Sequence, residues 1–283
     1  MFSICIPIYN QELSQLVYEL HRQAVATGLA FEILLIDDAS KQEYRAENRL
    51  IDLPHVRYIQ LEKNIGRAKI RNLLVEESKY QYLIFMDGDM GVESGDYIRN
   101  YVTYMNDGIV CVGGRTYELQ RPVPQKILHW KYGRTRETNS NIFMTCNFMI
   151  DKTHFDQIQF TMALDGYGHE DTLFGIQLKE AGIIIQHITN PLIHLDVKDA
   201  ELFLNHTENA LRNLAKINRL LQDQDGNYSQ LLQTKNKLDK TGITVLARTL
   251  FPLVKPLLRR HLLSKHPSLL ALDVYKFGFF VNL

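Results

Sequence analysis

Two aspartates separated by a single glycine, Asp87 and Asp89, are the residues of this sequence best suited to chemistry. They directly follow the apolar run 82–86, so we expect them at the end of a buried strand. Two carboxylates one residue apart can share a hard divalent cation, or one can bind the cation while the other orients a ligand. Mg²⁺ and Mn²⁺ prefer such oxygen ligands and usually keep positions open for phosphate oxygens. The motif therefore indicates a metal site that accepts a phosphorylated ligand.

A second acidic pair, Glu170 and Asp171, follows Gly168 and His169 at the predicted start of a helix. Carboxylates at a helix start are commonly caps that complement the helix dipole. The functional alternative is a general base, because adjacent like charges raise the proton affinity of one carboxylate and suit it to take a proton from a hydroxyl. On that interpretation Gly166 and Gly168 let a substrate approach closely.

Three further side chains could complete such a site. His194 follows the last predicted strand, and a neutral imidazole can join an aspartate pair as a metal ligand, although a lone histidine is more often packed or exposed. Arg67 and Arg71 are four residues apart at a predicted helix start, so they share one face. They could bind a diphosphate together with the helix N-terminus, or form a solvated face.

Four apolar runs and the helical stretches between them must position these residues. The runs that predict strands are 2–8, 31–36, 56–61 and 82–86. Strands that alternate with helices predict a mainly parallel sheet covered on both faces, in which ligands bind beyond the carboxyl ends of the strands. Three of these runs end in polar residues, at 37–38, 64–66 and 87–89, as a ligand site at this edge requires.

The rest of the chain changes in character. Residues 115–141 are polar and predict a mobile loop, 141–150 and 183–186 predict strands, and 170–181 predict a helix that ends at Gly182. From Asp199 onward strands disappear, and Leu211, Leu214, Ile217 and Leu221 form a helical stripe. We therefore predict two domains, 1–197 and a helical extension 198–283.

The composition is that of a soluble globular chain. Of 283 residues, 45% are hydrophobic and 23% charged, which excludes disorder as the main state, and no apolar run is long enough to span a bilayer. The N-terminus lacks the features of a signal peptide, and three widely spaced cysteines argue against a disulfide framework or zinc cluster. These observations predict a cytoplasmic protein.

The net charge of zero, from 32 basic and 32 acidic residues, conceals a segregation. Residues 240–283 carry seven basic residues and one acidic residue, a net charge of +6, so the remaining chain carries −6. An acidic body disfavours nucleic-acid binding, and a basic tail predicts a separate partner for the tail.

Taken in order, the motifs resemble those of family 2 inverting glycosyltransferases with the GT-A fold, over roughly the first 195 residues. The matching segments are Ile6-Pro-Ile-Tyr-Asn10, Asp37-Asp38-Ala-Ser40, Asn64-Ile-Gly66 through Arg71-Asn72, Asp87-Gly-Asp89 and Gly168-His-Glu170-Asp171. The resemblance implies an α/β GT-A domain with a mainly parallel central sheet. It also implies transfer of a hexosyl or N-acetylhexosaminyl group from a nucleotide-sugar donor to an acceptor hydroxyl of a glycan or lipid-linked saccharide.

The resemblance further implies a role for each matching residue. Pro7 and Tyr9 would lie beside the nucleotide base, and Asp38 would accept the uracil N3–H, which favours a UDP-sugar. The remaining donor-binding residues would be Asn64, Gly66, Arg67, Arg71, Asp87 and Gly88. Asp89 would bind Mn²⁺ or Mg²⁺, with His194 matching a metal-binding histidine of some members. Asp171 would be the general base, and Glu170 would hold the acceptor.

The sequence is compatible with more than one function. No Gln-x-x-Arg-Trp motif and no membrane spans are present, which favours transfer of single sugars over processive polymer synthesis. An aspartate after a strand also serves as the nucleophile of haloacid dehalogenase-type phosphatases, but here the motif follows the fourth strand and continues as Met-Gly. A nucleotidyltransferase and a non-catalytic nucleotide-sugar-binding scaffold also stay open.

The basic tail contains an amphipathic helical pattern. Leucines at 246, 250, 253 and 257 fall on one face, and Arg248, Lys255 and Arg259 fall on the opposite face, with Pro252 and Pro256 expected to bend the helix. Such a helix could lie on an anionic membrane at the inner face, or form a homodimer. The favoured expectation is that the leucines pack on the protein or on a second subunit while the basic face is solvated.

Overall fold

The structure, a computed structural model, describes residues 1–138, 140–161, 164, 167–221 and 228–283. The chain divides into two compact units. The first unit comprises Met1–Glu118, Glu137–Met162 and Phe174–Asp196, and the second comprises Leu119–Arg136, Ala163–Leu173 and Val197–Leu283. Two segments that precede residue 197 therefore group with the C-terminal helices. The two units are described separately below.

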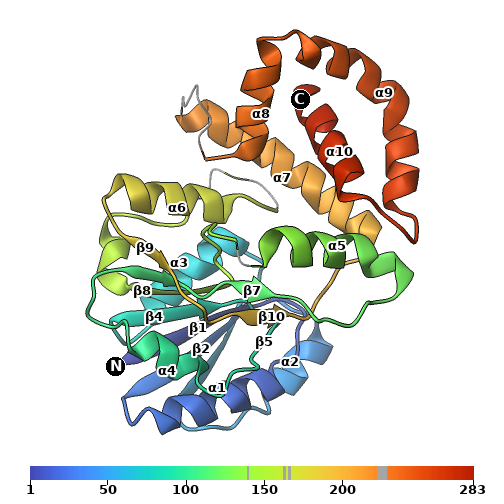
Figure 1. The fold of residues 1–283 in the computed structure, drawn as a ribbon. Coiled ribbons are helices and arrows are strands. Elements are labelled where there is room, and N and C mark those ends of the chain that lie inside the picture. The colour runs from blue at the N-terminus through green and yellow to red at the C-terminus, as the bar shows by residue number, and fades with distance from the viewer. Residues whose placement is uncertain (139, 162–163, 165–166, 222–227) are drawn as a thin grey trace. The chain divides into compact units, whose positions relative to one another are not determined.

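The first unit is built on a seven-stranded sheet with the order β3-β2-β1-β4-β8-β6-β9 (Figure 1). The strands are β1 (Phe2–Ile8), β2 (Phe31–Asp37), β3 (Val56–Gln60), β4 (Tyr82–Met86), β6 (Val110–Val112), β8 (Asn147–Asp151) and β9 (Ile185–His187). Among them only β8 runs antiparallel to its neighbours. The fold is therefore the predicted mainly parallel α/β type, and all four predicted N-terminal strands are confirmed.

A small second sheet, β5-β10-β7, lies in the same unit. Its strands are β5 (Met90–Gly91), β7 (Arg115–Thr116) and β10 (Leu192–His194). In β10, His194 pairs with Met90 of β5, directly after the Asp87–Asp89 motif, and Leu192 pairs with Arg115 of β7. This short sheet therefore brings segments together that are about a hundred residues apart in sequence.

The alternation of side chains along the strands creates two hydrophobic cores. In β1, Phe2, Ile4, Ile6 and Ile8 face one core and Cys5 faces the other, as the two-residue period of a strand requires. Helices α1 (Ser14–Ala26) and α4 (Tyr97–Val102) cover the first face. Helices α3 (Arg67–Glu77) and α6 (Glu170–Glu180) cover the second, and α2 (Gln42–Asn48) follows β2.

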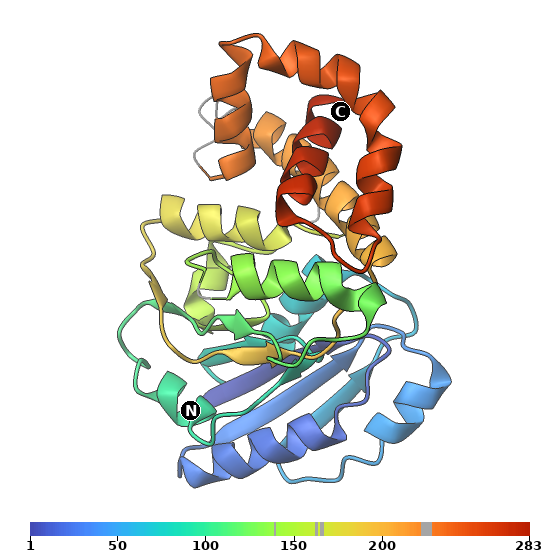
Figure 2. The same ribbon diagram turned by 45° about the vertical axis from the view of Figure 1, so that its right-hand side comes forward.

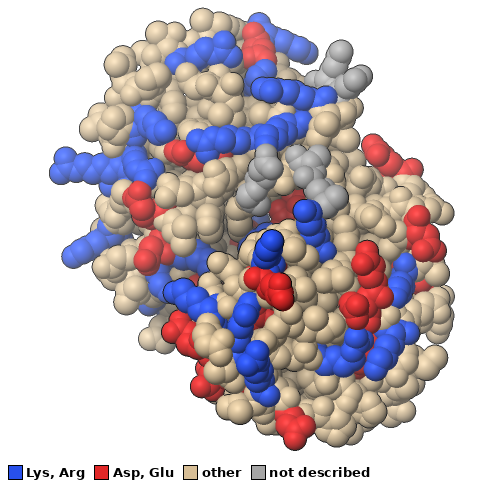
Figure 3. Space-filling view, turned by 180° about the vertical axis from the view of Figure 1, so that it is seen from behind, with Lys and Arg blue, Asp and Glu red and all other residues tan. Residues whose placement is uncertain are grey.

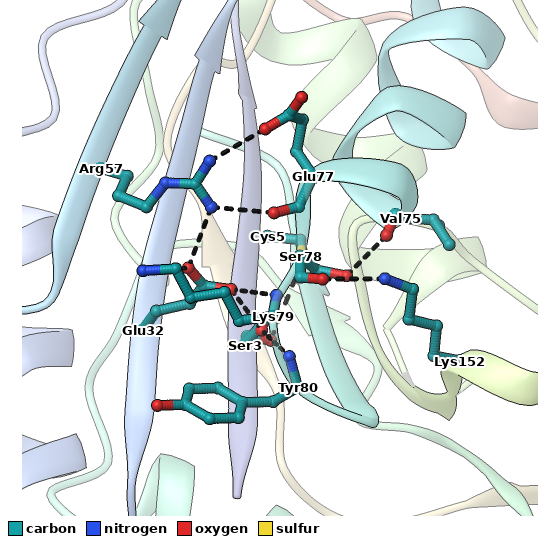
Figure 4. A network of polar contacts seen from close by, with 10 residues as sticks. All are labelled: Ser3, Cys5, Glu32, Arg57, Val75, Glu77, Ser78, Lys79, Tyr80 and Lys152. Carbon is teal, nitrogen blue, oxygen red and sulfur yellow. Dashed lines mark hydrogen bonds and ion pairs between the residues drawn. The ribbon is translucent and has the colours of Figure 1, made fainter.

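A network of polar contacts closes the amino-terminal edge of the sheet, opposite the edge that carries the polar strand ends (Figure 4). The buried Glu32 carboxylate accepts hydrogen bonds from Ser3 Oγ at 2.8 Å and from the Lys79 backbone amide at 2.5 Å. Arg57 bridges Glu32 at 3.2 Å and Glu77 at 2.9 Å. A buried charge stays stable when it is paired and hydrogen-bonded, so this network ties β1, β2, β3 and α3 together.

The second unit is helical in its described residues. It contains α5 (Ile127–Tyr132), α7 (Ala200–Leu221), α8 (Gln230–Asp239), α9 (Ile243–Leu262) and α10 (Leu269–Val281), seen from a second side in Figure 2. The predicted stripe on α7 is confirmed, because Leu211, Leu214 and Ile217 are buried. A Cβ on Gly278 of α10 would lie 2.1 Å from Phe251 of α9, so this glycine permits the two helices to approach closely.

Two local predictions are wrong. Residues 115–141, predicted as a mobile loop, contain β7, a 3₁₀ turn at Pro124–Lys126, α5 and a π-helical turn at Gly133–Glu137; Asn139 lies outside the described residues. The run 141–150 forms a strand only from Asn147. The polar side chains of the first segment pair with one another, as described below, and this pairing supports structure that composition alone does not reveal.

No single helix in the described part of the chain is long and apolar enough to cross a membrane. Helices α8 and α9 reach the length and apolar composition of a membrane span only when they are taken together, and they are bent by 112° relative to each other. All three cysteines are buried free thiols.

Candidate active site

The carboxyl ends of β1, β2 and β4 place the predicted polar residues at one edge of the first unit's sheet. Asp37 and Asp38 end β2, and both are buried. Asp37 accepts hydrogen bonds from the Ser40 amide at 2.7 Å and from Tyr58 Oη at 2.8 Å. Burial and then this bond to Asp37 raise the pKa of Tyr58 to about 12. Asp37 is therefore a structural residue that supports the turn carrying Asp38.

The Asp38 carboxylate organises the loop before α3. Its two oxygens accept the backbone amides of Ile65 at 2.6 Å and Gly66 at 3.0 Å, and its carbonyl accepts Asn64 Nδ2 at 3.1 Å. Gly66 adopts a φ of +85°, a conformation that suits glycine. Each carboxylate oxygen has two lone pairs, so Asp38 retains capacity for one further donor.

Arg67 and Arg71 have different environments despite their shared helix face. Arg71 is buried, with a 2% exposed side chain, and donates to Asp87 Oδ1 at 2.7 Å. Its guanidinium also lies 5.8 Å from the Phe160 ring centroid. Arg67 is exposed. For Arg71 the solvated-face alternative is therefore wrong, because this side chain is bound to the acidic motif.

The two predicted metal ligands meet across the small sheet. His194 Nε2 lies 3.3 Å from Asp89 Oδ2, and both side chains are largely buried. The antiparallel pairing of β10 with β5 produces this contact, together with a bond from the Leu195 amide to the Asp89 carbonyl at 2.9 Å. A carboxylate and an imidazole at this separation can hold one divalent cation.

The side chains of Asp89 and His194 fit a metal ion that is also coordinated by a bound phosphorylated ligand. Within the described residues, no group of three or more His, Cys, Asp or Glu side chains is arranged to hold an ion. Two protein ligands are sufficient when phosphate oxygens and water supply the remaining positions, as is usual for Mg²⁺. Asp89 and His194 would therefore hold Mn²⁺ or Mg²⁺ jointly with a diphosphate.

Sequence analysis did not identify a cluster of three residues, Arg115, Tyr117 and Glu137, of which Tyr117 contacts His194. The Tyr117 ring contacts the His194 ring edge-on at 5.3 Å between centroids, and the Tyr117 hydroxyl donates to Glu137. Glu137 also pairs with Arg115 at 2.5 Å. Arg115 is in β7 and Tyr117 directly follows this strand, whereas Glu137 lies 20 residues beyond Tyr117, so no local spacing in the sequence indicates their association.

The other predicted donor-binding residues lie near the same edge. Pro7 is the penultimate residue of β1 and partly buried, while Tyr9 is 55% exposed just beyond it. Asn64 is exposed in the loop that Asp38 organises. Gly88 sits in the turn between β4 and β5, where an added Cβ would lie 2.5 Å from the end of the flexible Gln11 side chain.

The second predicted group, Glu170 and Asp171, belongs to the second unit at the start of α6. Glu170 is buried. Asp171 Oδ1 accepts the Thr172 amide at 2.7 Å, and His169 Nδ1 lies 3.0 Å from Thr172 Oγ1. Burial, and then the positive charge of Lys276, lowers the pKa of His169 to about 4. His169 is therefore neutral at pH 7.

The glycine before this turn has a packing role. Gly168 has a φ of +99°, and an added Cβ would lie 2.7 Å from the Ala210 Cβ of α7. Asn213 of α7 donates to the Gly168 carbonyl at 3.0 Å. The space beside Gly168 is thus filled by α7 and not open to a substrate, which corrects the prediction for this residue; Gly166 lies outside the described residues.

Comparisons with known proteins identify the family and the fold. The model of the family described as Glycosyl transferase family 2 matches residues 3–165. A curated relative, an uncharacterized glycosyltransferase of Haemophilus influenzae, is 36% identical over 91 residues, which cover 31% of this chain and 29% of that protein. The chain thus spans under a third of the length of this relative.

Two solved structures share the fold. A mannosyltransferase from Pyrobaculum calidifontis, solved in complex with GDP-Man and Mn²⁺, has a TM-score of 0.64 at 12% identity over 99% of this chain and 85% of its own. S. aureus TarS 1–349, solved in complex with UDP-GlcNAc, has a TM-score of 0.51 at 18% identity over 75% of this chain and 66% of its own. At these identities the likeness shows the fold alone, which is that of GT-A type glycosyltransferases.

Proposed function

The chain belongs to glycosyl transferase family 2, and from this membership and the site we propose that it transfers a single sugar from a nucleotide-diphosphate sugar to an acceptor hydroxyl. We propose further that the reaction inverts the anomeric configuration and requires a divalent metal. The acceptor would be a glycan or lipid-linked saccharide. The observation that carries the proposal is the contact of 3.3 Å between Asp89 and His194 at the carboxyl edge of the sheet.

The donor would bind across this edge. The first amides of α3 have no partner within the helix, so its N-terminus favours a negative ligand such as a diphosphate. Arg71 holds Asp87 in place, and Asp87 would contact the ribose or sugar of the donor. Asp38 has lone pairs that can accept a uracil N3–H, and on this basis we propose UDP as the nucleotide. The two similar solved structures contain GDP-Man and UDP-GlcNAc, which differ in the nucleotide base, so the choice of nucleotide is tested by experiment below.

The chemistry follows from the residue types. A divalent cation held by Asp89 and His194 would neutralise the charge of the departing diphosphate. Asp171 would accept the proton of the acceptor hydroxyl while the oxygen of that hydroxyl attacks the anomeric carbon. The bond from that carbon to the diphosphate oxygen breaks on the opposite face, and the nucleoside diphosphate leaves with the electron pair. Glu170 would hold the acceptor through hydrogen bonds.

Donor binding tests the metal site without an acceptor. We expect UDP-sugars, measured by calorimetry against a panel that includes GDP-mannose, to bind in Mn²⁺ or Mg²⁺ and to bind far more weakly after chelation. The variant Asp89→Asn should lose the metal dependence. Asp96→Asn is the matched control, because Asp96 is an exposed aspartate of the same unit that pairs only with Arg99 among the described residues. Equal donor affinity with and without metal would contradict the metal role, and preference for a nucleotide without uracil would contradict the role of Asp38.

The variant Asp171→Asn tests the general base. Loss of a general base typically lowers a rate by about 10²–10⁴-fold. We expect sugar transfer, or the slow hydrolysis of the donor when no acceptor is present, to fall by that amount while donor affinity stays close to that of the parent protein. Near-normal turnover in this variant would contradict the assignment of Asp171 as the general base.

A further inference from the structure

One face of α9 is apolar and turned to solvent. Leu246, Leu250, Leu253 and Leu257 are 58%, 46%, 73% and 68% exposed. At 100° per residue the four side chains fall within an arc of about 60°. Thr244, Phe251 and Leu262 are buried on the opposite side of the helix, against the core of the second unit. The exposed face is therefore a continuous leucine stripe along a 20-residue helix.

The basic residues of α9 point the other way. Lys255 Nζ lies 3.2 Å from Glu208 of α7, Arg259 pairs with Glu201, and Arg248 Nε donates to the Val281 carbonyl of α10 at 2.8 Å. The expectation that the leucines pack on the chain itself and that the basic face is solvated is therefore wrong, whereas packing of the leucines on a second subunit stays a prediction. The burial of Phe251 and Leu262, together with these polar contacts, orients α9, which lies along the outer edge of the helical unit in both Figure 1 and Figure 2.

Positive charge borders the leucine stripe. Helix α9 contains four lysine and arginine residues and no acidic residue. Arg260 is exposed, lies about 20° from the edge of the stripe, and has no ion-pair partner among the described residues, as is also true of Lys265 just beyond the helix. Basic side chains outnumber acidic ones over the helical unit on the face seen in Figure 3.

We propose that the leucine stripe of α9 binds an anionic lipid bilayer, with the helix lying in the plane of the membrane surface. Soluble proteins rarely leave such an apolar stripe in water without a partner. A helix with an apolar face and basic neighbours enters the headgroup boundary and is attracted by anionic lipids. A bilayer is favoured over a second copy of the chain, because an anionic surface complements Arg260 and Lys265, whereas α9 of a second copy contains no acidic residue to pair with them.

Sedimentation of the full chain with lipid vesicles tests this surface and needs no knowledge of the sugar reaction. We expect the protein to pellet with vesicles of phosphatidylcholine and phosphatidylglycerol in equal parts at low salt, and much less with phosphatidylcholine alone. Added salt should weaken binding, since screening reduces attraction between exposed charges. The double variant Leu253→Gln, Leu257→Gln should bind the anionic vesicles about tenfold more weakly or worse.

The matched control is Leu50→Gln, Leu119→Gln, because these two leucines are 72% and 81% exposed but lie outside α9. All four changes are at exposed positions, and unchanged circular dichroism would confirm that each variant folds. The proposal is overturned if the parent protein does not pellet with anionic vesicles at low salt, or if both double variants bind equally well. It is also overturned if the parent forms a dimer in solution that only the Leu253, Leu257 variant abolishes, since the stripe would then belong to a second copy.

Discussion

The side chain of Asn147 connects three segments of the first unit through four hydrogen bonds, and its replacement should strongly lower the stability of this unit. Its side chain is fully buried at the start of β8. Oδ1 accepts hydrogen bonds from Tyr97 Oη at 2.8 Å and Tyr101 Oη at 2.7 Å. Nδ2 donates to the Gly114 carbonyl at 2.7 Å and to the Asn190 carbonyl at 2.8 Å. The amide thus connects α4 to the segments that lead into β7 and β10.

The cost of Asn147→Leu can be worked out from these bonds. Leucine has a similar size but leaves two tyrosine hydroxyls and the Asn190 carbonyl without this partner, whereas the Gly114 carbonyl still accepts the Leu192 amide at 3.3 Å. Each buried polar group left unsatisfied costs about 1–3 kcal/mol, and relaxation favours the lower part of the range, so we expect a loss of about 3–5 kcal/mol. That is a large part of the roughly 5–15 kcal/mol of stability typical of a folded protein. Since β10 carries His194, metal-dependent donor binding should weaken as well.

The tyrosines provide a finer test by urea unfolding followed with circular dichroism. Tyr97→Phe or Tyr101→Phe alone should cost about 1 kcal/mol, because Oδ1 keeps the other donor. The double variant leaves Oδ1 without either donor and should cost about 1–2 kcal/mol more than the sum of the single changes. Tyr104→Phe is the control, since its hydroxyl bonds to no described residue. A cost below about 2 kcal/mol for Asn147→Leu, or strict additivity of the tyrosine changes, would refute this reasoning.

Three other predictions concern single residues, each with a direct measurement. Arg71→Met should cost about 2 kcal/mol or more of unfolding free energy by leaving Asp87 unpaired, whereas Arg22→Met, which breaks an exposed pair with Glu19, should cost much less; equal costs would contradict the burial argument. Gly168→Ala should destabilise the second unit by about 2–4 kcal/mol through its φ of +99° and its clash with Ala210, and Gly242→Ala, with a φ of +75° and open space, should show only the backbone part; the same midpoint shift in both would exclude the clash. The pKa of His169 falls from its usual 6.5 to about 4 in the folded protein, so the free energy of unfolding should decrease by up to about 3 kcal/mol as the pH falls from 6.5 to about 4. This pH dependence should flatten in His169→Gln, and an unchanged slope would mean that another group controls it.

Much of the first unit could be predicted because its signals are local. The apolar runs that form β1, β2, β3 and β4 are short, continuous and separated by helical stretches, and this pattern predicts parallel strands buried on both faces. Parallel strands place their carboxyl ends at one edge, so the clusters around Asp38 and Asp89 could be expected together from the strand pattern alone. Their residue types, two or more carboxylates and an imidazole, also indicate a divalent cation.

Contacts between distant segments could not be predicted in this way. The Asp89 and His194 side chains are 105 residues apart, and only the pairing of β5 with β10 brings them to 3.3 Å. The association of Arg115, Tyr117 and Glu137 and the four bonds of Asn147 likewise depend on strands that meet through the fold. The polar composition of residues 115–141 predicted a loop, because composition carries no information on which polar side chains pair with one another.

Helix α9 shows most clearly what the sequence determines and what depends on the tertiary structure. Its sequence alone determined that α9 has a leucine face and a basic face, because both follow from a repeat of about 3.6 residues. Only the tertiary structure decided which face is buried. Phe251 and Leu262 lie on the same side of α9 as the basic residues and pack into the core of the second unit, and Lys255 and Arg259 reach Glu208 and Glu201 of α7. Partners on another helix cannot be predicted from the periodicity of α9 itself.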